Sequence, residues 1–353
     1  MRERLGRVQY SAKWKTWGRS ARSVLEMPSL ARFAWGVLVY DVAVVVWGAY
    51  VRATGSGAGC GRHWPMCNGE ILLRAPRVET LIELSHRITS GGAFFLTVAL
   101  ALWALRSFPR GHRVRRSASV SVALMATEAL IGAGLVLLEL VAHDASMKRA
   151  LGMSLHLINT FLLLGSTALT AWWASGGGAA RLRRQGALVL ALGLPLLAMI
   201  VVGTSGAVTA LGDTLFPAAS VADGLAQDFS PSAPLFVKLR TVHPILAIST
   251  AVAVIFATGL VRALRPTRAV AISSKAAAVL VVTQVTAGLL DVALRAPVAM
   301  QLIHLALADL VWVALVLTAA AALAEAEEPV GTNLPNSHPP CEISGPPPAA
   351  MDS

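Results

Sequence analysis

Residues 81–104 of this chain read LIELSHRITSGGAFFLTVALALWA, an apolar run with a few polar residues near its start. A bilayer core about 30 Å thick requires about 20 mostly apolar residues in one helix, and this run is long enough to span it. The run does not alternate in polarity as a strand of a membrane barrel does. Seven further runs have the same character: 33–51, 118–138, 153–174, 187–208, 241–261, 275–294 and 299–323. The sequence therefore predicts an all-α membrane protein with eight transmembrane helices.

The composition of the whole chain supports this prediction. Of its 353 residues, 55% are hydrophobic and 14% are charged, and the mean hydropathy is +0.64. Soluble globular proteins contain about 25% charged residues, so the composition excludes a disordered chain and disfavours a soluble one. Because the first run begins well inside the chain and seven others follow it, we expect it to remain as a helix rather than to be cleaved as a signal peptide.

The basic residues gather on one side of the predicted membrane. The chain has 30 Lys and Arg against 19 Asp and Glu, and 20 of the 30 lie before the first run or in the connections after the second, fourth and sixth runs. Since basic loops stay in the cytoplasm, both termini are expected there, with the protein in the plasma membrane. This orientation accounts for the net charge of +11. No basic segment with interleaved aromatic residues points to nucleic acid.

The two halves of the chain repeat each other. His86 and His243 lie near the starts of the second and sixth runs, and His156 and His304 lie in the fourth and eighth. Because four helices restore the direction of the chain, the repeats are parallel rather than inverted. We predict two tandem four-helix bundles, at 33–175 and 187–323. A basic cytoplasmic segment, 1–32, precedes them, and a disordered cytoplasmic tail, 324–353, follows.

These four histidines lie at a similar depth, toward the outer side, in helices that run from outside to inside. A histidine within a membrane span is costly and is a candidate functional residue. The simpler interpretation of any one of them is an interhelical hydrogen bond. Two imidazoles facing each other in a four-helix bundle can instead bind a heme iron axially. Zinc would need a third or fourth close ligand, which two histidines per bundle do not supply.

Charged residues surround the outer ends of these helices. Glu83 precedes His86 by three residues and shares its helix face, whereas Arg240 takes the equivalent position before His243. Glu83 is expected to relay protons or stabilise a cation; the alternative is an interfacial residue favoured by the helix dipole. The outer arginines are candidates for pairing with heme propionates or for snorkelling to the interface: Arg52, Arg74, Arg77, Arg87, Arg240 and Arg295.

Several other polar features have no assignment from spacing alone. Cys60 and Cys67 lie in the first outer loop, on the oxidising side, where either a disulfide or a pair of free thiols is compatible with their separation. Asp41 falls in the middle of the first run, where it must be protonated, paired or exposed to a wet cavity. Glu128 lies in the third run at the position that Gln284 occupies in the second repeat. The long connection 209–238 is expected to cap the outer end of the second bundle.

Together these motifs resemble the heme A synthase family. The resemblance rests on Arg52-x-Thr54-Gly55-Ser56-Gly57 before Cys60, on Trp64-Pro65 and Cys67-Asn68-Gly69, on Glu83-x-x-His86-Arg87, and on His156-Leu157, Val242-His243 and His304-Leu305 in order. It covers about 35–320 and neither terminal extension. Family members are expected to carry glutamine where this chain has Glu128, which leaves the role of Glu128 open.

The resemblance implies a function and a set of roles. A heme A synthase oxidises the C8 methyl group of heme O to a formyl group by two successive hydroxylations and loss of water. It implies that His86 and His156 bind the substrate heme, that His243 and His304 bind a b-type heme that transfers electrons, and that Glu83 is catalytic. It also implies a disulfide between Cys60 and Cys67. The partners implied are heme O, a heme O synthase, an electron donor, membrane lipid and further copies of the chain.

Two other functions are compatible with parts of this pattern. A non-catalytic di-heme b-type cytochrome would also carry two histidine pairs, but it needs neither Glu83 nor the cysteine loop. A transporter with sites at the middle of the membrane fits less well, because the polar residues gather near the outer face and the repeats are not inverted.

Overall fold

The computed structural model describes residues 28–69, 76–183 and 185–324. Within them the regular elements are helices joined by turns and short connections, and an isolated bridge links Ala180 and Ala324. Eight of its helices are long and apolar enough to cross a membrane, as predicted. The long helices are α2 (Ser29–Ala53), α3 (Val78–Ser107), α4 (Arg113–Leu137), α5 (Met147–Ala174), α6 (Gly186–Leu215), α9 (Val242–Leu264), α10 (Arg268–Ala293) and α11 (Val298–Ala322). The short ones are η1 (Ser56–Ala58), α7 (Val221–Asp228) and α8 (Leu235–Arg240).

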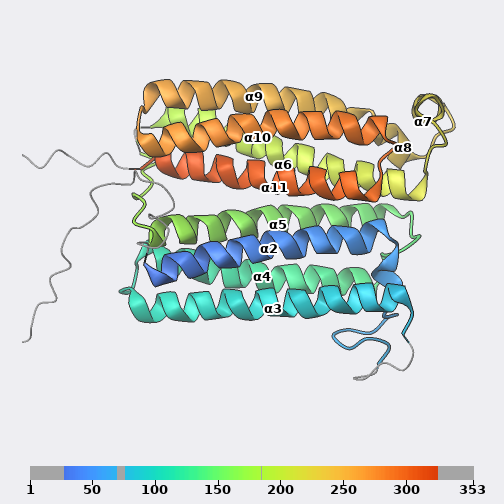
Figure 1. Cartoon of the computed structure of the whole chain (residues 1–353), viewed down its shortest axis with the longest axis horizontal. Helices are drawn as coiled ribbons and strands as arrows, with labels where there is room; N and C mark the ends of the chain where they lie inside the picture. Colours follow the sequence, from blue (N-terminus) through green and yellow to red (C-terminus); the bar gives the residue numbers. More distant parts are fainter. Residues whose placement is uncertain (1–27, 70–75, 184, 325–353) are drawn as a thin grey trace, which may run out of the picture.

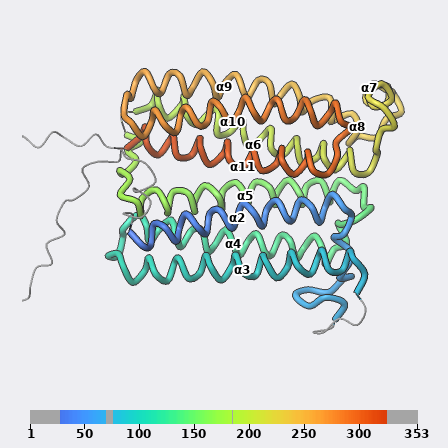
Figure 2. The backbone as a smooth tube through the Cα atoms, viewed as in Figure 1, coloured from blue at the N-terminus to red at the C-terminus, as the bar shows by residue number. Residues whose placement is uncertain are grey.

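The long helices form two groups of four (Figure 1). Helices α2, α3, α4 and α5 pack together, and α6, α9, α10 and α11 form the second group. Both groups follow the chain up and down in order, as the backbone trace shows (Figure 2). This arrangement is consistent with the predicted tandem bundles, which we call the first and second bundles. The described chain begins and ends at the same end of the molecule, as an even number of spans requires.

The two bundles meet along α5 and α11, which are the most buried of the eight spans. Helix α5 also contacts α6, and α11 contacts α2. At the centre of this interface the rings of Phe161 and Trp312 stack with their centroids 5.0 Å apart, and Trp312 Nε1 donates a hydrogen bond of 2.5 Å to the carbonyl of Phe161. The second histidine of each predicted pair lies on one of these central helices, so the two histidine pairs lie on either side of this interface.

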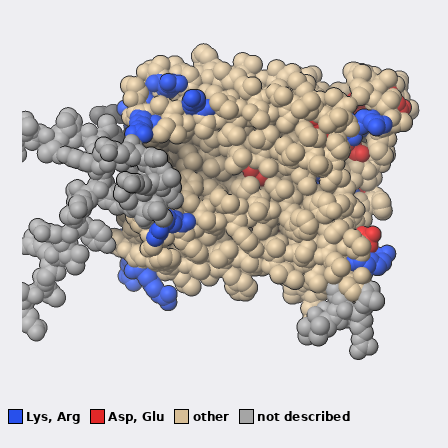
Figure 3. Space-filling view, in the orientation of Figure 1, with Lys and Arg blue, Asp and Glu red and all other residues tan. Residues whose placement is uncertain are grey.

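Charged side chains gather at the two ends of the molecule and leave an apolar band between them, in which acidic atoms are visible at only one place on the face shown (Figure 3). This distribution matches a protein that spans a bilayer. The cytoplasmic placement of 1–27 and 325–353, including Cys341, lies outside the described residues.

Several boundaries differ from the sequence-based prediction: α5 begins at Met147 rather than 153, α10 begins at Arg268 rather than 275, and α6 ends at Leu215 rather than 208. Helix α6 continues to Leu215 because no helix-breaking proline occurs after 208 before Pro217, and Leu211 packs in a buried cluster with Phe236. The remainder of the predicted outer loop contains α7 and α8, which lie at the outer end of the second bundle (Figure 1). The connection is therefore a short helical cap rather than an irregular loop.

Candidate functional site: two histidine pairs beneath the outer surface

The histidine pair of the second bundle comes from α9 and α11. The ring centroids of His243 and His304 are 6.4 Å apart, and the rings are nearly perpendicular, at 86°. Each ring has one nitrogen engaged: Ser205 Oγ lies 2.9 Å from His243 Nδ1, and Gln284 Nε2 lies 3.2 Å from His304 Nε2. The other nitrogen of His304, Nδ1, is buried and has no hydrogen-bond partner among the described residues. One ring nitrogen of this pair, Nδ1 of His304, is therefore left without a protein partner in the described chain.

The pair of the first bundle comes from α3 and α5. The Nδ1 atom of His86 is also buried without a hydrogen-bond partner in the described part of the chain. Glu128 Oε1 on α4 lies 3.1 Å from His156 Nδ1. Glu128 also accepts hydrogen bonds from Asn159, at 2.5 Å, and from Thr160. The first pair thus has a carboxylate where the second has the amide of Gln284.

The described residues contain two pairs of span histidines and no larger set of metal ligands. Among the described residues, no group of three or more His, Cys, Asp and Glu side chains is arranged to hold a metal ion. Ring nitrogens left without protein partners in the interior of a helical bundle are costly unless something else binds them. A heme supplies the iron that two such nitrogens can ligate, and its flat ring suits the interior of a helical bundle.

Glu83 lies one helical turn before His86 and is almost completely buried, with 3% of its surface exposed. Its Oε1 accepts a hydrogen bond of 2.5 Å from Nη2 of Arg87, and its Oε2 accepts one of 2.8 Å from the backbone N–H of Cys60. Both carboxylate oxygens are therefore fixed, one by a side chain of the same helix and one by the outer loop.

The outer loop is fastened to the start of α3. Cys60 and Cys67 form a disulfide and are both buried. Gly59 lies so close to the α3 backbone that a Cβ atom there would come within 2.5 Å of the carbonyl of Glu79, so only glycine fits. Thr80 Oγ1 donates a hydrogen bond of 2.7 Å to the Gly59 carbonyl. This loop covers the Glu83 carboxylate from the outside.

The predicted propionate partners already bind protein acceptors. Arg87 donates to Glu83 and to the loop carbonyls of His63, at 2.6 Å, and Met66, at 2.8 Å. Arg240 pairs with Asp213 at 3.0 Å and Asp228 at 2.9 Å.

Arg52, at the end of α2, reaches into the second bundle. It donates to the Ala210 carbonyl at 2.9 Å, to Thr214 at 3.0 Å and to Gln301 at 2.7 Å. Arg52 therefore joins the two bundles at their outer end, a role that the sequence did not indicate.

The remaining described outer arginines, Arg77 and Arg295, make fewer contacts with other protein groups. Arg77 makes an exposed ion pair with Glu79 at 4.0 Å, and Arg295 donates to the Ala219 carbonyl at 2.7 Å. Arg74 lies outside the described residues.

Besides Glu83, two buried acids lie in the described spans. Asp41 on α2 and Asp309 on α11 are 2% and 0% exposed, and neither carboxyl group has a hydrogen-bond partner among the described residues. Of the states expected for Asp41, pairing is thus not observed in this part of the chain. Asp309 was not singled out from the sequence, although it follows His304 by five residues in an otherwise apolar run.

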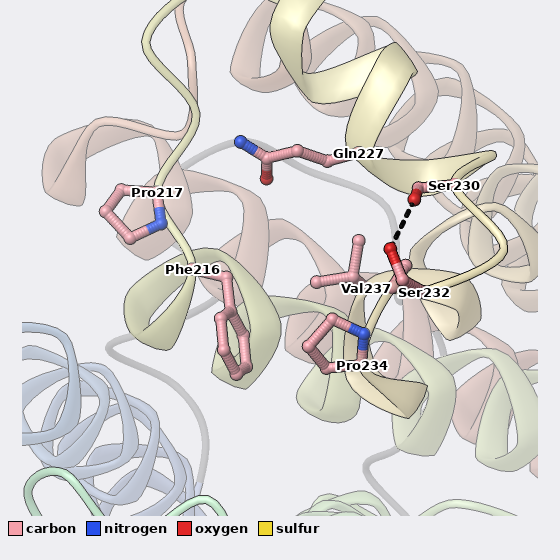
Figure 4. Close-up of a pocket in the computed structure, with 8 residues that line it drawn as sticks. Phe216, Pro217, Gln227, Ser230, Ser232, Pro234 and Val237 are labelled. Carbon is pink, nitrogen blue, oxygen red and sulfur yellow. Dashed lines mark hydrogen bonds between the residues drawn. The ribbon is translucent and has the colours of Figure 1, made fainter.

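The outer cap of the second bundle encloses an open hollow of about 370 Å³ (Figure 4). Its walls come from the end of α6, from α8 and from the α7–α8 connection, and include Phe216, Pro234 and Val237. Gln227 and the hydrogen-bonded pair Ser230 and Ser232 provide its polar part. None of the predicted ligands lines this hollow.

Comparison with known proteins identifies a family for this chain. A family model described as cytochrome oxidase assembly protein, COX15-CtaA, matches residues 31–316, from α2 into α11. The chain belongs to the COX15-CtaA family. This match confirms the resemblance to heme A synthases at the level of the family.

Several relatives of this COX15-CtaA protein are known by name. It is 53% identical over 294 residues to a protoheme IX farnesyltransferase of Thermus thermophilus, with 83% of this chain and 48% of that protein covered. It is 34% identical over 185 residues to a heme A synthase of an Exiguobacterium species, covering 52% of this chain and 59% of the relative. It is 41% identical over 101 residues to a heme A synthase of Alkalihalophilus pseudofirmus, covering 29% and 33%. The chain spans about half the length of the first of these relatives.

Proposed function

We propose that this chain is a heme A synthase, an oxidoreductase that converts the C8 methyl group of heme O to the formyl group of heme A through two successive hydroxylations and loss of water. The observation that carries the proposal is the pair of imidazoles in each bundle, 6.4 Å apart in the second. A metal–imidazole bond is about 2 Å long, so two such bonds and the two ring radii account for a separation of this size.

The different surroundings of the two histidine pairs support a different heme in each bundle. Residues 33–175 hold the substrate heme O between His86 and His156, and residues 187–323 hold a b-type heme between His243 and His304. Glu83 and the disulfide loop lie beside the first pair alone. A centre that only transfers electrons needs neither, so the chemistry belongs to the first bundle.

Glu83 is the catalytic residue in this proposal, placed near the methyl group that reacts. Its two oxygens are held by Arg87 and by the Cys60 N–H, so the anion keeps its position during the reaction. A carboxylate held in advance in a buried site stabilises positive charge that develops nearby. The b-type heme, when bound, supplies electron transfer. Arg52, Arg87 and Arg240 are the residues that would pair with heme propionates.

The position of the two pairs supports transfer of electrons between them. His156 and His304 lie on α5 and α11, the helices that form the interface between the bundles. The Phe161–Trp312 stack joins α5 to α11, and Arg52 joins α2 to α11. The electron donor to the second bundle is a further partner.

The names of the relatives suggest where the substrate comes from. A protein named protoheme IX farnesyltransferase contains a segment 53% identical to this chain. A farnesyl group transferred to protoheme IX is the modification that distinguishes heme O, so we propose that a heme O synthase delivers the substrate to this protein. We also place the protein in the plasma membrane with both termini cytoplasmic, because the connections at that end carry most of the basic residues.

The name of the Thermus relative favours a second candidate function, farnesyl transfer to protoheme IX. Because the match covers 48% of that protein, the activity in its name can reside in the part outside the match. The histidine pairs favour heme A formation over farnesyl transfer, since two axial ligands per bundle serve an iron centre.

Heme analysis of the purified protein tests these functions. The chain is produced in cells lacking their own heme A synthase, with and without a co-expressed heme O synthase, and the extracted hemes are separated. Heme A together with heme B, formed only when heme O is supplied, is the expected result. Heme B alone in both cases identifies a di-heme cytochrome, and heme O formed without the added synthase identifies a farnesyltransferase.

Alanine variants test the proposed roles of His243 and Glu83. His243→Ala should lose the b-type heme. Glu83→Ala should retain heme O but form little heme A, whereas Glu79→Ala, an exposed acid one turn earlier, should convert normally.

A further inference from the structure

Each of the four histidines faces a glycine on the preceding membrane helix. Gly48 on α2 faces His86, and Gly206 on α6 faces His243, so the first helix of each bundle supports the first histidine. The third helix of each bundle supports the second histidine: Gly132 on α4 faces His156, and Gly288 on α10 faces His304. The arrangement repeats in both halves of the molecule.

Three of these contacts leave no room for a methyl group. A Cβ atom at Gly48 would lie 2.9 Å from Cε1 of His86. At Gly206 it would lie 3.0 Å from Cε1 of His243, and at Gly288 it would lie 2.8 Å from Cε1 of His304. Because carbon atoms pack best at about 3.5–4.0 Å, alanine at any of these positions would displace the ring.

The fourth contact is looser. A Cβ atom at Gly132 would lie 3.8 Å from Nε2 of His156, an ordinary packing distance. His156 also lies near the carboxylate of Glu128, at 3.1 Å from Nδ1. The ring of His156 is therefore less closely confined by its glycine than the other three rings are.

The presence of glycine alone does not explain these contacts, since glycine is frequent in membrane helices. At three other glycines of these helices, a Cβ atom would have no described atom of another residue within 4 Å: Gly36 on α2, Gly134 on α4 and Gly193 on α6. Gly203 on α6 also has a close contact, since a Cβ atom there would lie 2.8 Å from Cε2 of Phe161. Small residues let neighbouring helices and side chains approach closely. The glycines that face histidines use this property at the site itself.

We propose that Gly48, Gly206 and Gly288 are positioning residues that hold three imidazoles in fixed orientations, and that His156 is the one ligand free to turn away from its metal. The proposal rests on the function given above. The heme of the second bundle stays bound, and both of its ligands are tightly supported. The heme of the first bundle is a substrate that must enter and leave, and one of its two ligands has room to move.

Alanine variants of the heme-loaded full-length protein test the proposal. The readouts are heme content, the electron paramagnetic resonance spectrum of each oxidised heme, which depends on the orientation of its imidazole planes, and the midpoint potential. Gly206→Ala and Gly288→Ala should shift the b-type heme signals, and Gly48→Ala should shift those of the substrate heme. Gly132→Ala and the matched controls Gly134→Ala and Gly193→Ala should leave the spectra unchanged.

Carbon monoxide tests the freedom of His156. With both hemes reduced, carbon monoxide should bind the substrate heme and leave the b-type heme unchanged. Binding to both hemes or to neither would overturn the assignment of His156 as the movable ligand. Unchanged spectra in Gly206→Ala and Gly288→Ala would overturn the positioning role.

A variant that fails to accumulate is also informative. If Gly206→Ala is lost because its methyl group collides with the ring, then the double variant Gly206→Ala with His243→Ala should accumulate as well as His243→Ala alone. If the double variant fails to accumulate while His243→Ala accumulates, the proposal is overturned. A wild-type protein with no low-spin heme would refute the proposed function itself, whereas intact wild-type spectra with unaltered glycine variants would refute only this inference.

Discussion

Replacing Arg87 by methionine should destabilise the protein by about 3–5 kcal/mol, because it removes one partner of a buried ion pair. The side chains of Arg87 and Glu83 are only 11% and 4% exposed, and Nη2 of Arg87 lies 2.5 Å from Glu83 Oε1. Without Arg87, the Glu83 carboxylate keeps the Cys60 N–H as its one remaining hydrogen-bond donor in the described structure. The loop carbonyls of His63 and Met66 lose their donor at the same time.

The assay is chemical unfolding in detergent, compared with Arg77→Met. Arg77 also pairs with a glutamate, Glu79, but the side chains are 78% and 50% exposed and the N–O distance is 4.0 Å. An exposed pair contributes about 0–1 kcal/mol, so this control should change little.

A second substitution tests whether the unpaired charge of Glu83 causes the loss of stability. Adding Glu83→Gln to Arg87→Met removes the unpaired buried charge and should restore part of the lost stability. Equal stability of Arg87→Met and Arg77→Met, or a double variant less stable than Arg87→Met, would refute the burial argument.

Three further outcomes are expected. Replacing both Cys60 and Cys67 by serine should cost about 2–3 kcal/mol from the closed loop and should expose the outer loop to protease, read as faster cleavage in a limited digest. Glu128→Gln should raise the midpoint potential of the substrate heme, because it removes a negative charge beside the heme ligand, and Gln284→Glu should lower the midpoint potential of the b-type heme. Redox titration with both hemes resolved measures each shift. A change in the potential of the other heme would contradict this expectation. Trp312→Phe should lower the thermal stability by about 1–2 kcal/mol, because the α5 carbonyl at the bundle interface loses its extra donor, and an unchanged melting temperature would count against that contact.

The two halves of the molecule are alike in architecture and unlike in chemistry. Glu128 and Gln284 occupy matched positions beside matched histidines, yet one is charged and the other neutral. Glu83 and Arg240 also occupy matched positions. Glu83 is held by Arg87 and the disulfide loop, and Arg240 is bound to Asp213 and Asp228. The duplication therefore preserves the histidine pairs while the surrounding charges differ, as the proposed substrate site and electron-transfer site would require.

The sequence alone determined the number of spans, their order and the common depth of the four histidines. These follow from local properties, since a hydrophobic run long enough to span a bilayer forms a helix there whatever its neighbours are. The motif around Cys60, Glu83 and His86 was enough to indicate the family. Helix ends were less well predicted. The end of α6, for example, extends beyond the membrane-length run into the cap.

Only the tertiary structure decided which polar groups meet. Arg52 was expected at a propionate but joins α2 to α6 and α11, because the fold brings residues far apart in the chain within hydrogen-bond distance. The fixing of Glu83 by a loop N–H, the support of each histidine by a glycine and the burial of Asp309 without a partner in the described chain also depend on how helices pack against each other. Spacing along one helix predicts which residues share a face, but the partner across an interface depends on the rotation and offset of a second helix, which packing of the whole molecule determines.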